Sequence, residues 1–149
     1  MAEEQTAPAR LRALASWQAG RVATLGARLT AAHMALEARS DFAVLAALDE
    51  LGALSQAEIG RSLGLDRANV NRIVTRLERE GLLERAADPH DGRRLVLTAT
   101  AAGGDHLRDL ERRAARVQDE LLVALDAEER EQLRLLLDRV LAAHPAQPA

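Results

Sequence analysis

Residues 54–103 read LSQAEIGRSLGLDRANVNRIVTRLEREGLLERAADPHDGRRLVLTATAAG, and this stretch decides the fold. Ser55 and Glu58 have the Ser-x-x-Glu spacing of a capping box, which predicts the start of a short helix. Gly64 is expected to end that helix, and Asp66 offers its side chain as the cap of a second one. Two short helices joined by a tight glycine turn indicate a helix-turn-helix unit.

A small β-hairpin is expected directly after the second helix, which Gly81 ends. Residues 82–85 and 94–98 are expected to form two short strands, and the second of them alternates Leu95 and Leu97 with other residues. The turn-rich sequence Ala-Ala-Asp-Pro-His-Asp-Gly separates the two strands. A hairpin that follows a helix-turn-helix unit makes a winged helix, so the sequence predicts a mainly α fold with a small β-hairpin wing.

Helical segments are predicted on both sides of this central unit. The N-terminal side is expected to form one long helix over 9–39, followed by a second helix that Ser40 or Asp41 caps. The C-terminal side is expected to form a helix over 101–125 and a last helix that begins at Asp126. We call these flanking segments the arms.

The arms carry apolar stripes at alternating spacings of three and four residues, as one face of a helix requires. The central unit is too small to cover both arms, so burial against the arms of a second copy predicts a two-fold homodimer. Packing of the two arms on each other within one chain is the alternative. The stripes contain Val22, Leu25, Leu29, Ala32 and Leu36, and then Leu107, Leu110, Ala114, Val117, Leu121 and Leu125.

The composition excludes several classes of protein. Alanine and leucine supply 57 of the 149 residues, and Trp17 and Phe42 are the only aromatic residues, which favours helices over strands. The absence of cysteine excludes disulfides, thiolate metal sites and thiol redox sensing. No apolar run approaches the ~18 residues of a membrane helix, so we expect a cytoplasmic protein without a membrane partner. The net charge is −3, but residues 55–100 hold eight arginines against seven acidic residues.

Five segments occur with the order and spacing of motifs in the multiple-antibiotic-resistance (MarR) family of winged-helix regulators. They comprise the two helices of the unit, the start of the wing, a wing tip with Asp-x-Arg, and the Leu-Thr-x-x-Gly element of the next helix. Ala99 stands where that last element usually has leucine. The segments are 56–63, 71–78, 81–85, 88–93 and 99–103.

The chain therefore resembles the MarR family over about two fifths of its length. This resemblance implies a transcriptional regulator, usually a repressor, that binds a pseudo-palindromic operator as a homodimer. It also implies release from DNA when a small-molecule effector changes the spacing of the two winged units.

The second helix of the unit is expected to read double-stranded DNA, because a helical wheel gives it an apolar inner face and a polar outer face. Arginine suits guanine edges, asparagine suits adenine edges, and threonine or alanine can contact a thymine methyl group. The residues predicted to lie near bases are Ala68, Asn69, Asn71, Arg72 and Thr75. The residues predicted to contact phosphates are Arg67 and Arg76.

The wing supplies two further candidates. Arg93 at the tip is predicted to enter the minor groove, whose negative potential attracts arginine. Arg94 is predicted to face phosphate or solvent, and Asp91 to orient the loop. A salt bridge between Arg72 and Asp91 is the alternative to base contact by Arg72.

Trp17 and Arg21 are the candidates for binding an effector, because they lie one turn apart and Trp17 can stack on an aromatic ring. A place for Trp17 in the dimer core is the alternative. His33, Glu37 and His106 are side chains of the types that bind metals, and the first two lie four residues apart on one helix face. The histidines are dispersed along the sequence, however, so we expect no metal site and no cofactor.

The sequence thus predicts a DNA-binding regulator and not an enzyme, since no catalytic motif stands out. A winged helix used only for protein docking is the rival function. The predicted domains are a dimerisation region over 9–39 and 101–144, a winged unit over 40–100, and flexible tails at 1–8 and 145–149.

Overall fold

The computed structural model describes residues 7–144, so the tails predicted at 1–8 and 145–149 lie almost wholly outside the described residues. The mainly helical fold with one small hairpin is confirmed, although the helix expected over 101–125 ends earlier. The elements in chain order are α1 (Ala9–Arg12), α2 (Ala15–His33), α3 (Leu36–Leu51), α4 (Gln56–Leu63), α5 (Arg67–Arg79), β1 (Leu83–Ala87), β2 (Leu95–Ala99), α6 (Ala101–Leu121) and α7 (Ala127–Ala142).

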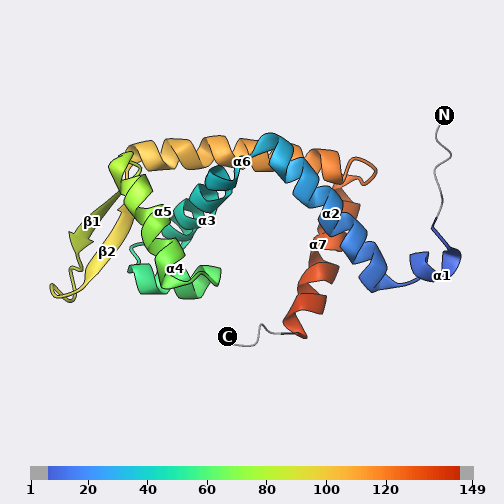
Figure 1. Ribbon diagram of the computed structural model, residues 1–149, viewed down its shortest axis with the longest axis horizontal. Helices are drawn as coiled ribbons and strands as arrows, with labels where there is room; N and C mark the ends of the chain where they lie inside the picture. The colour runs from blue at the N-terminus through green and yellow to red at the C-terminus, as the bar shows by residue number, and fades with distance from the viewer. Residues whose placement is uncertain (1–6, 145–149) are drawn as a thin grey trace.

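The long helix α6 connects two groups of elements (Figure 1). The winged unit, which consists of α3, α4, α5 and the β1–β2 hairpin, lies at one end of α6. The helices α2 and α7 lie at the other end, and α2 packs along α6. The DNA-reading candidates and the predicted dimerisation helices are therefore held apart by the length of α6.

The prediction of one continuous helix over 9–39 is wrong. The chain leaves the helical conformation at 13–14, and again after α2, where Met34 is extended with φ −138° and ψ 118°. Met34 is 4% exposed, so burial of its side chain fixes this link between two helices. The sequence suggested Ser40 or Asp41 as the cap of the second helix. Because α3 begins at Leu36, both residues lie inside this helix and neither of them caps it.

The caps predicted for the central unit are confirmed. Ser55 and Glu58 form a reciprocal capping box at α4, and the Asp66 side chain accepts a hydrogen bond at the start of α5. Gly64 and Gly81 have φ angles of 65° and 74°, a left-handed conformation that glycine adopts without a steric cost. Each of these devices acts within a few residues, which is why the sequence pattern was sufficient to predict them.

The hairpin pairs β1 and β2 in antiparallel register, with Leu83 opposite Ala99. Leu54 adds a short bridge to Leu97, since each backbone N–H donates to the other residue's carbonyl at 3.2 and 2.7 Å. The hairpin, the helices α3, α4 and α5, and the first part of α6 enclose one apolar core. Its buried residues are Val44, Leu45, Leu48, Ile59, Val70, Ile73, Val74, Leu77, Leu83, Leu97 and Leu107.

The start of α6 packs closely against the turn before β1 and is hydrogen-bonded to it. The Thr100 hydroxyl donates to the Gly81 carbonyl at 2.6 Å, and the Thr100 N–H donates to the Leu82 carbonyl at 3.1 Å. The same hydroxyl accepts from the Gly103 N–H at 3.1 Å and so caps α6. A Cβ atom at Gly103 would lie 1.9 Å from the Leu82 carbonyl oxygen, so this junction leaves no room for a side chain.

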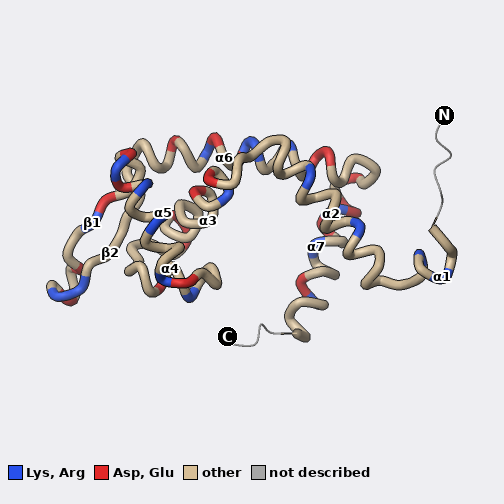
Figure 2. Tube along the Cα trace, in the orientation of Figure 1, with Lys and Arg blue, Asp and Glu red and all other residues tan. Residues whose placement is uncertain are grey.

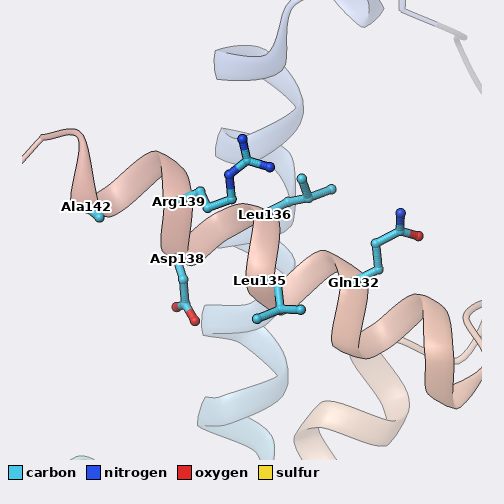
Figure 3. Close-up of a pocket in the computed structure, with 6 residues that line it drawn as sticks. All are labelled: Gln132, Leu135, Leu136, Asp138, Arg139 and Ala142. Carbon is cyan, nitrogen blue, oxygen red and sulfur yellow. The ribbon is translucent and has the colours of Figure 1, made fainter.

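The apolar faces of α2 and α7 remain uncovered in a single chain. Neither helix contains a buried residue. An open hollow of about 560 Å³ lies against α7, and Figure 3 shows the six side chains that line it. The exposed large apolar side chains of α2 and α7 are Val22, Leu25, Leu135, Leu136, Leu137, Val140 and Leu141.

Among residues 7–144, no helix has both the length and the apolar character needed to cross a membrane.

Candidate nucleic-acid interface

The helix α5 has the two-faced character that the helical wheel predicted. Its inner residues are at most 2% exposed, and its outer residues face solvent beside the hairpin. The α4–α5 turn fixes this orientation, because the Asp66 carboxylate accepts from the Asn69 N–H at 2.9 Å. The inner residues are Val70, Ile73, Val74 and Leu77. The exposed outer candidates are Arg67, Ala68, Asn69, Asn71, Arg72 and Thr75.

An open hollow of about 400 Å³ lies along the outer face of α5. Positive charge is distributed over α5 and over the hairpin loop, as Figure 2 shows. The exposed polar face of α5 and the hairpin loop belong to the same winged unit, in which α5 packs against β1, so a single ligand with regularly spaced negative charges can contact both. The hollow is lined by Glu37, Asn71, Arg72, Thr75, Arg76 and Arg79.

Arg72 is exposed and projects from the outer face of α5. Within residues 7–144, it has no ion pair with Asp91 or with any other carboxylate. Asp91 instead accepts a hydrogen bond from the Arg93 N–H at 3.1 Å and shapes the loop. The salt bridge between Arg72 and Asp91, which was the alternative to base contact, is therefore absent from the described residues. Its absence leaves the Arg72 guanidinium free to contact a ligand.

Arg76 has a different environment from its neighbours on α5. Its guanidinium forms an ion pair with the buried carboxylate of Asp41 on α3 and lies 3.5 Å from Glu80. Asp41 also lies 3.3 Å from His106 Nε2 on α6. The Asp41 hydrogen bond raises the pKa of Arg76. This cluster joins the three helices α3, α5 and α6, and the phosphate contact of Arg76 stays a prediction.

The two adjacent arginines of the wing also differ. Arg93 is exposed, and its described hydrogen bond comes from its backbone N–H alone. The Arg94 side chain instead turns back to the helices, where it forms an ion pair with Glu58 and lies 3.7 Å from Asp88. Arg93 is thus placed to meet a ligand, whereas Arg94 contacts other elements of the chain.

A chain of polar contacts that the sequence analysis missed joins β1 to both helices. Arg85 donates to Gln56 Oε1 at 3.0 Å and to Glu78 Oε2 at 3.0 Å. Gln56 in turn donates to the Asn71 side-chain oxygen at 3.3 Å. Arg85 comes two residues after the apolar Leu83, so the two-residue period of a strand places both side chains on one face, and this was the signal available in the sequence.

The pKa of Glu58 is lowered from 4.5 to about 2, chiefly by the Ser55 N–H and then by Arg94. A carboxylate with a lowered pKa stabilises the fold fully above its unfolded value, and the stabilisation is lost as the pH falls toward 2. The free energies of unfolding of the wild type and of Glu58→Gln should therefore converge between pH 4.5 and 2. Urea unfolding followed by circular dichroism measures this, and a difference that is constant with pH would contradict it.

The candidate effector residues lie on α2, away from α5. The Arg21 guanidinium lies 5.5 Å from the centroid of the half-buried Trp17 ring, within the range of a cation–π contact. The histidines considered as metal ligands are not gathered. His33 Nε2 lies 2.7 Å from Glu120, and in residues 7–144 no three metal-ligating side chains form a cluster.

Comparison with known proteins matches this geometry to one group of regulators. The model of the MarR family matches residues 38–94. The HTH-type regulator YxaD of Bacillus subtilis is 30% identical over 102 residues, which cover 68% of this chain and 71% of YxaD. The chain belongs to the MarR family.

The chain is also similar to two other transcriptional regulators, PcaV and NicR. The crystal structure of PcaV from Streptomyces coelicolor in complex with its natural ligand is 34% identical, covers 91% of this chain and 96% of PcaV, and has a TM-score of 0.68. The repressor NicR of Pseudomonas putida is 30% identical over 100 residues, or 67% of this chain and 63% of NicR. The aligned part covers between 41% and 71% of the first curated relatives.

In this MarR-family chain, the glycine of the Leu-Thr-x-x-Gly element has a physical explanation. Gly103 lets the first turn of α6 lie directly against the Leu82 carbonyl. The threonine of the element, Thr100, caps α6 and also holds Gly81. The departure at Ala99 is accommodated in the core beside the buried residues of β2.

Proposed function

We propose that this MarR-family protein is a cytoplasmic repressor that binds a pseudo-palindromic operator as a homodimer and dissociates when a small effector binds. In this proposal, Asn71, Arg72 and Thr75 contact bases in the major groove, and Arg93 enters the minor groove. Arg67 contacts phosphate, and the rest of the helix and wing hold these residues in place.

The observation that carries the proposal is the exposed outer face of α5. Arg72 is exposed with no carboxylate partner in the described chain, while the inner face of the same helix is buried. A helix held in this way, with its polar residues outward and a basic loop beside it, fits the width of the major groove.

The uncovered apolar faces of α2 and α7 support self-association. Leu136 and Leu137 are about half exposed, and Leu136 contributes to the hollow of about 560 Å³ shown in Figure 3. Monomeric proteins rarely leave such a contiguous apolar surface in water. A second copy covers it with identical helices and places two α5 helices about 34 Å apart, one turn of the duplex.

The effector is proposed to bind near Trp17 and Arg21, where an aromatic anion could stack on the ring and pair with the guanidinium. The ligand complex of PcaV supports a small-molecule effector for this chain as well. We propose no catalytic activity, because the exposed face of α5 combines groups that bind and lacks an activated nucleophile.

The test is selection of bound fragments from a random duplex library with the full-length chain, followed by fluorescence anisotropy on the enriched sequence. We expect a pseudo-palindrome, binding about 10³-fold tighter than to scrambled duplex, and steep loss of affinity with salt. Light scattering should give twice the 16.1 kDa chain mass. Compounds that release the operator should also alter the fluorescence of Trp17, the single tryptophan.

A protein-docking module predicts a different outcome, because it enriches no duplex sequence. Selection that yields no preferred sequence, or a monomer that binds its enriched site as tightly as a dimer does, contradicts the proposed function.

A further inference from the structure

The ion pair between Glu58 and Arg94 crosses from the helices to the wing. Glu58 lies on α4 and Arg94 lies immediately before β2, and the two residues are 36 positions apart in the sequence. Their side chains are 30% and 40% exposed, so the pair is partly shielded from water. It is a direct side-chain connection between the first helix of the helix-turn-helix and the loop that carries Arg93.

The wing end of this connection is held by the backbone of the loop. The Arg94 N–H donates to the Asp91 carbonyl at 2.9 Å, and the Arg94 carbonyl accepts from the Asp88 N–H at 2.8 Å. The Arg94 side chain also lies near the Asp88 carboxylate. The residue that pairs with Glu58 is therefore hydrogen-bonded through its backbone to both Asp88 and Asp91 of the loop over 88–94.

The helix end of the connection is held by the capping box. The Glu58 carboxylate accepts from the Ser55 N–H at 2.8 Å and from the Ser55 hydroxyl at 3.0 Å. These two hydrogen bonds hold the Glu58 side chain in place independently of Arg94. Glu129 caps α7 in the same way and accepts from the Asp126 N–H at 2.9 Å. In residues 7–144, Glu129 has no ion pair with an arginine, so it provides a matched control.

We propose that Glu58 and Arg94 form a strut that positions the wing, so that Arg94 acts on DNA binding through Arg93 and not by contact with phosphate. A two-stranded hairpin is only marginally stable by itself, and its free loop needs such a support. This inference rests on the proposed function for its effect on DNA, but the strut itself is a property of the protein alone.

The direction in which Glu58→Gln changes the affinity for DNA distinguishes the strut from a direct phosphate contact by Arg94. Glu58→Gln removes a negative charge near the duplex and frees Arg94, so electrostatics alone predicts tighter DNA binding. The strut predicts weaker binding, because the loop that carries Arg93 loses its side-chain contact with α4. Glutamine at this position keeps the capping box, which limits damage to α4.

In the DNA experiment, anisotropy compares Glu58→Gln, Arg94→Gln, their double variant and Glu129→Gln on the selected operator. We expect each wing variant to bind about tenfold more weakly, and the double variant to bind no more weakly than either single one. If Arg93 reads a narrow, A/T-rich minor groove beside the core bases, Arg93→Gln should lose the preference for A/T-rich flanks. Glu58→Gln and Arg94→Gln should lose the same preference, while they retain discrimination in the core bases. Glu129→Gln should remain within twofold of the wild type, and equal or tighter binding by Glu58→Gln would overturn the strut.

A second experiment needs no DNA. The chain has no cysteine, so His90→Cys in the wing loop provides a unique site for a nitroxide spin label. We expect Glu58→Gln and Arg94→Gln to raise the mobility of the label equally, and Glu129→Gln to leave it unchanged. Thermal unfolding by circular dichroism checks that each variant is folded.

These two experiments distinguish the failure of the strut from that of the proposed function. A mobile wing in a chain that selects no duplex sequence supports the strut and contradicts operator binding. Unchanged label mobility in both folded wing variants overturns the strut, even where operator binding is retained.

Discussion

Replacing Gly103 by alanine is expected to cost about 3 kcal/mol or more of unfolding free energy, because the junction between α6 and the turn before β1 has no room for the added methyl group. The new Cβ would lie 1.9 Å from the Leu82 carbonyl oxygen and 3.0 Å from the carbonyl carbon. Both are backbone atoms, so no side-chain rotation relieves the overlap. The first turn of α6 must shift, which breaks the hydrogen bonds that Thr100 makes across the junction.

Urea unfolding followed by circular dichroism measures this loss, and the melting temperature should fall by roughly 10 °C. The adjacent Gly104→Ala is the matched control, because its Cβ would meet only the flexible Arg108 guanidinium, at 3.7 Å. Alanine is the better helix former, so this variant should equal the wild type or exceed it by up to about 1 kcal/mol. A Gly103→Ala variant as stable as Gly104→Ala would refute the account of the junction.

The parts of the fold that the sequence predicted correctly are those set by local chemistry. The capping box of Ser55 and Glu58, the Asp66 cap and the turns at Gly64 and Gly81 each depend on residues at most five positions apart. The link at Met34 depends instead on burial against other elements, so a continuous apolar stripe gave no sign of it. Local patterns predict how a helix starts more reliably than where tertiary packing interrupts it.

The same distinction applies to the candidate interface. The exposed face of α5 follows from a 3.6-residue period, and the helical wheel therefore predicted it. The partners of Arg76 and Arg94 could not be predicted, because Asp41 and Glu58 are 35 and 36 residues away in the sequence. An arginine side chain is long enough to reach either a phosphate or a distant carboxylate, and only the three-dimensional arrangement selects between them.

Arg72→Ala is expected to reduce affinity for the selected operator by about a hundredfold or more, and to leave the dimer and its stability unchanged. A bidentate arginine–guanine pair contributes about 1–3 kcal/mol, and a two-fold dimer presents the pair twice. Arg72 is exposed and has no ion pair in the described chain, so its removal leaves no buried charge behind. Anisotropy on the operator and on scrambled duplex, with light scattering for the dimer, measures each part of this expectation.

Two variants show whether this loss comes from base recognition or from charge. Arg72→Lys keeps the charge without the planar fork, so it should lose discrimination at one base position per half-site while it retains most of the binding to scrambled duplex. Arg112→Ala removes another exposed arginine, on α6, where its partner is Asp109, and should leave operator affinity within twofold. If Arg72→Lys bound the operator as tightly as the wild type, Arg72 would act as a phosphate contact, and sequence discrimination would have to come from Asn71 and Thr75.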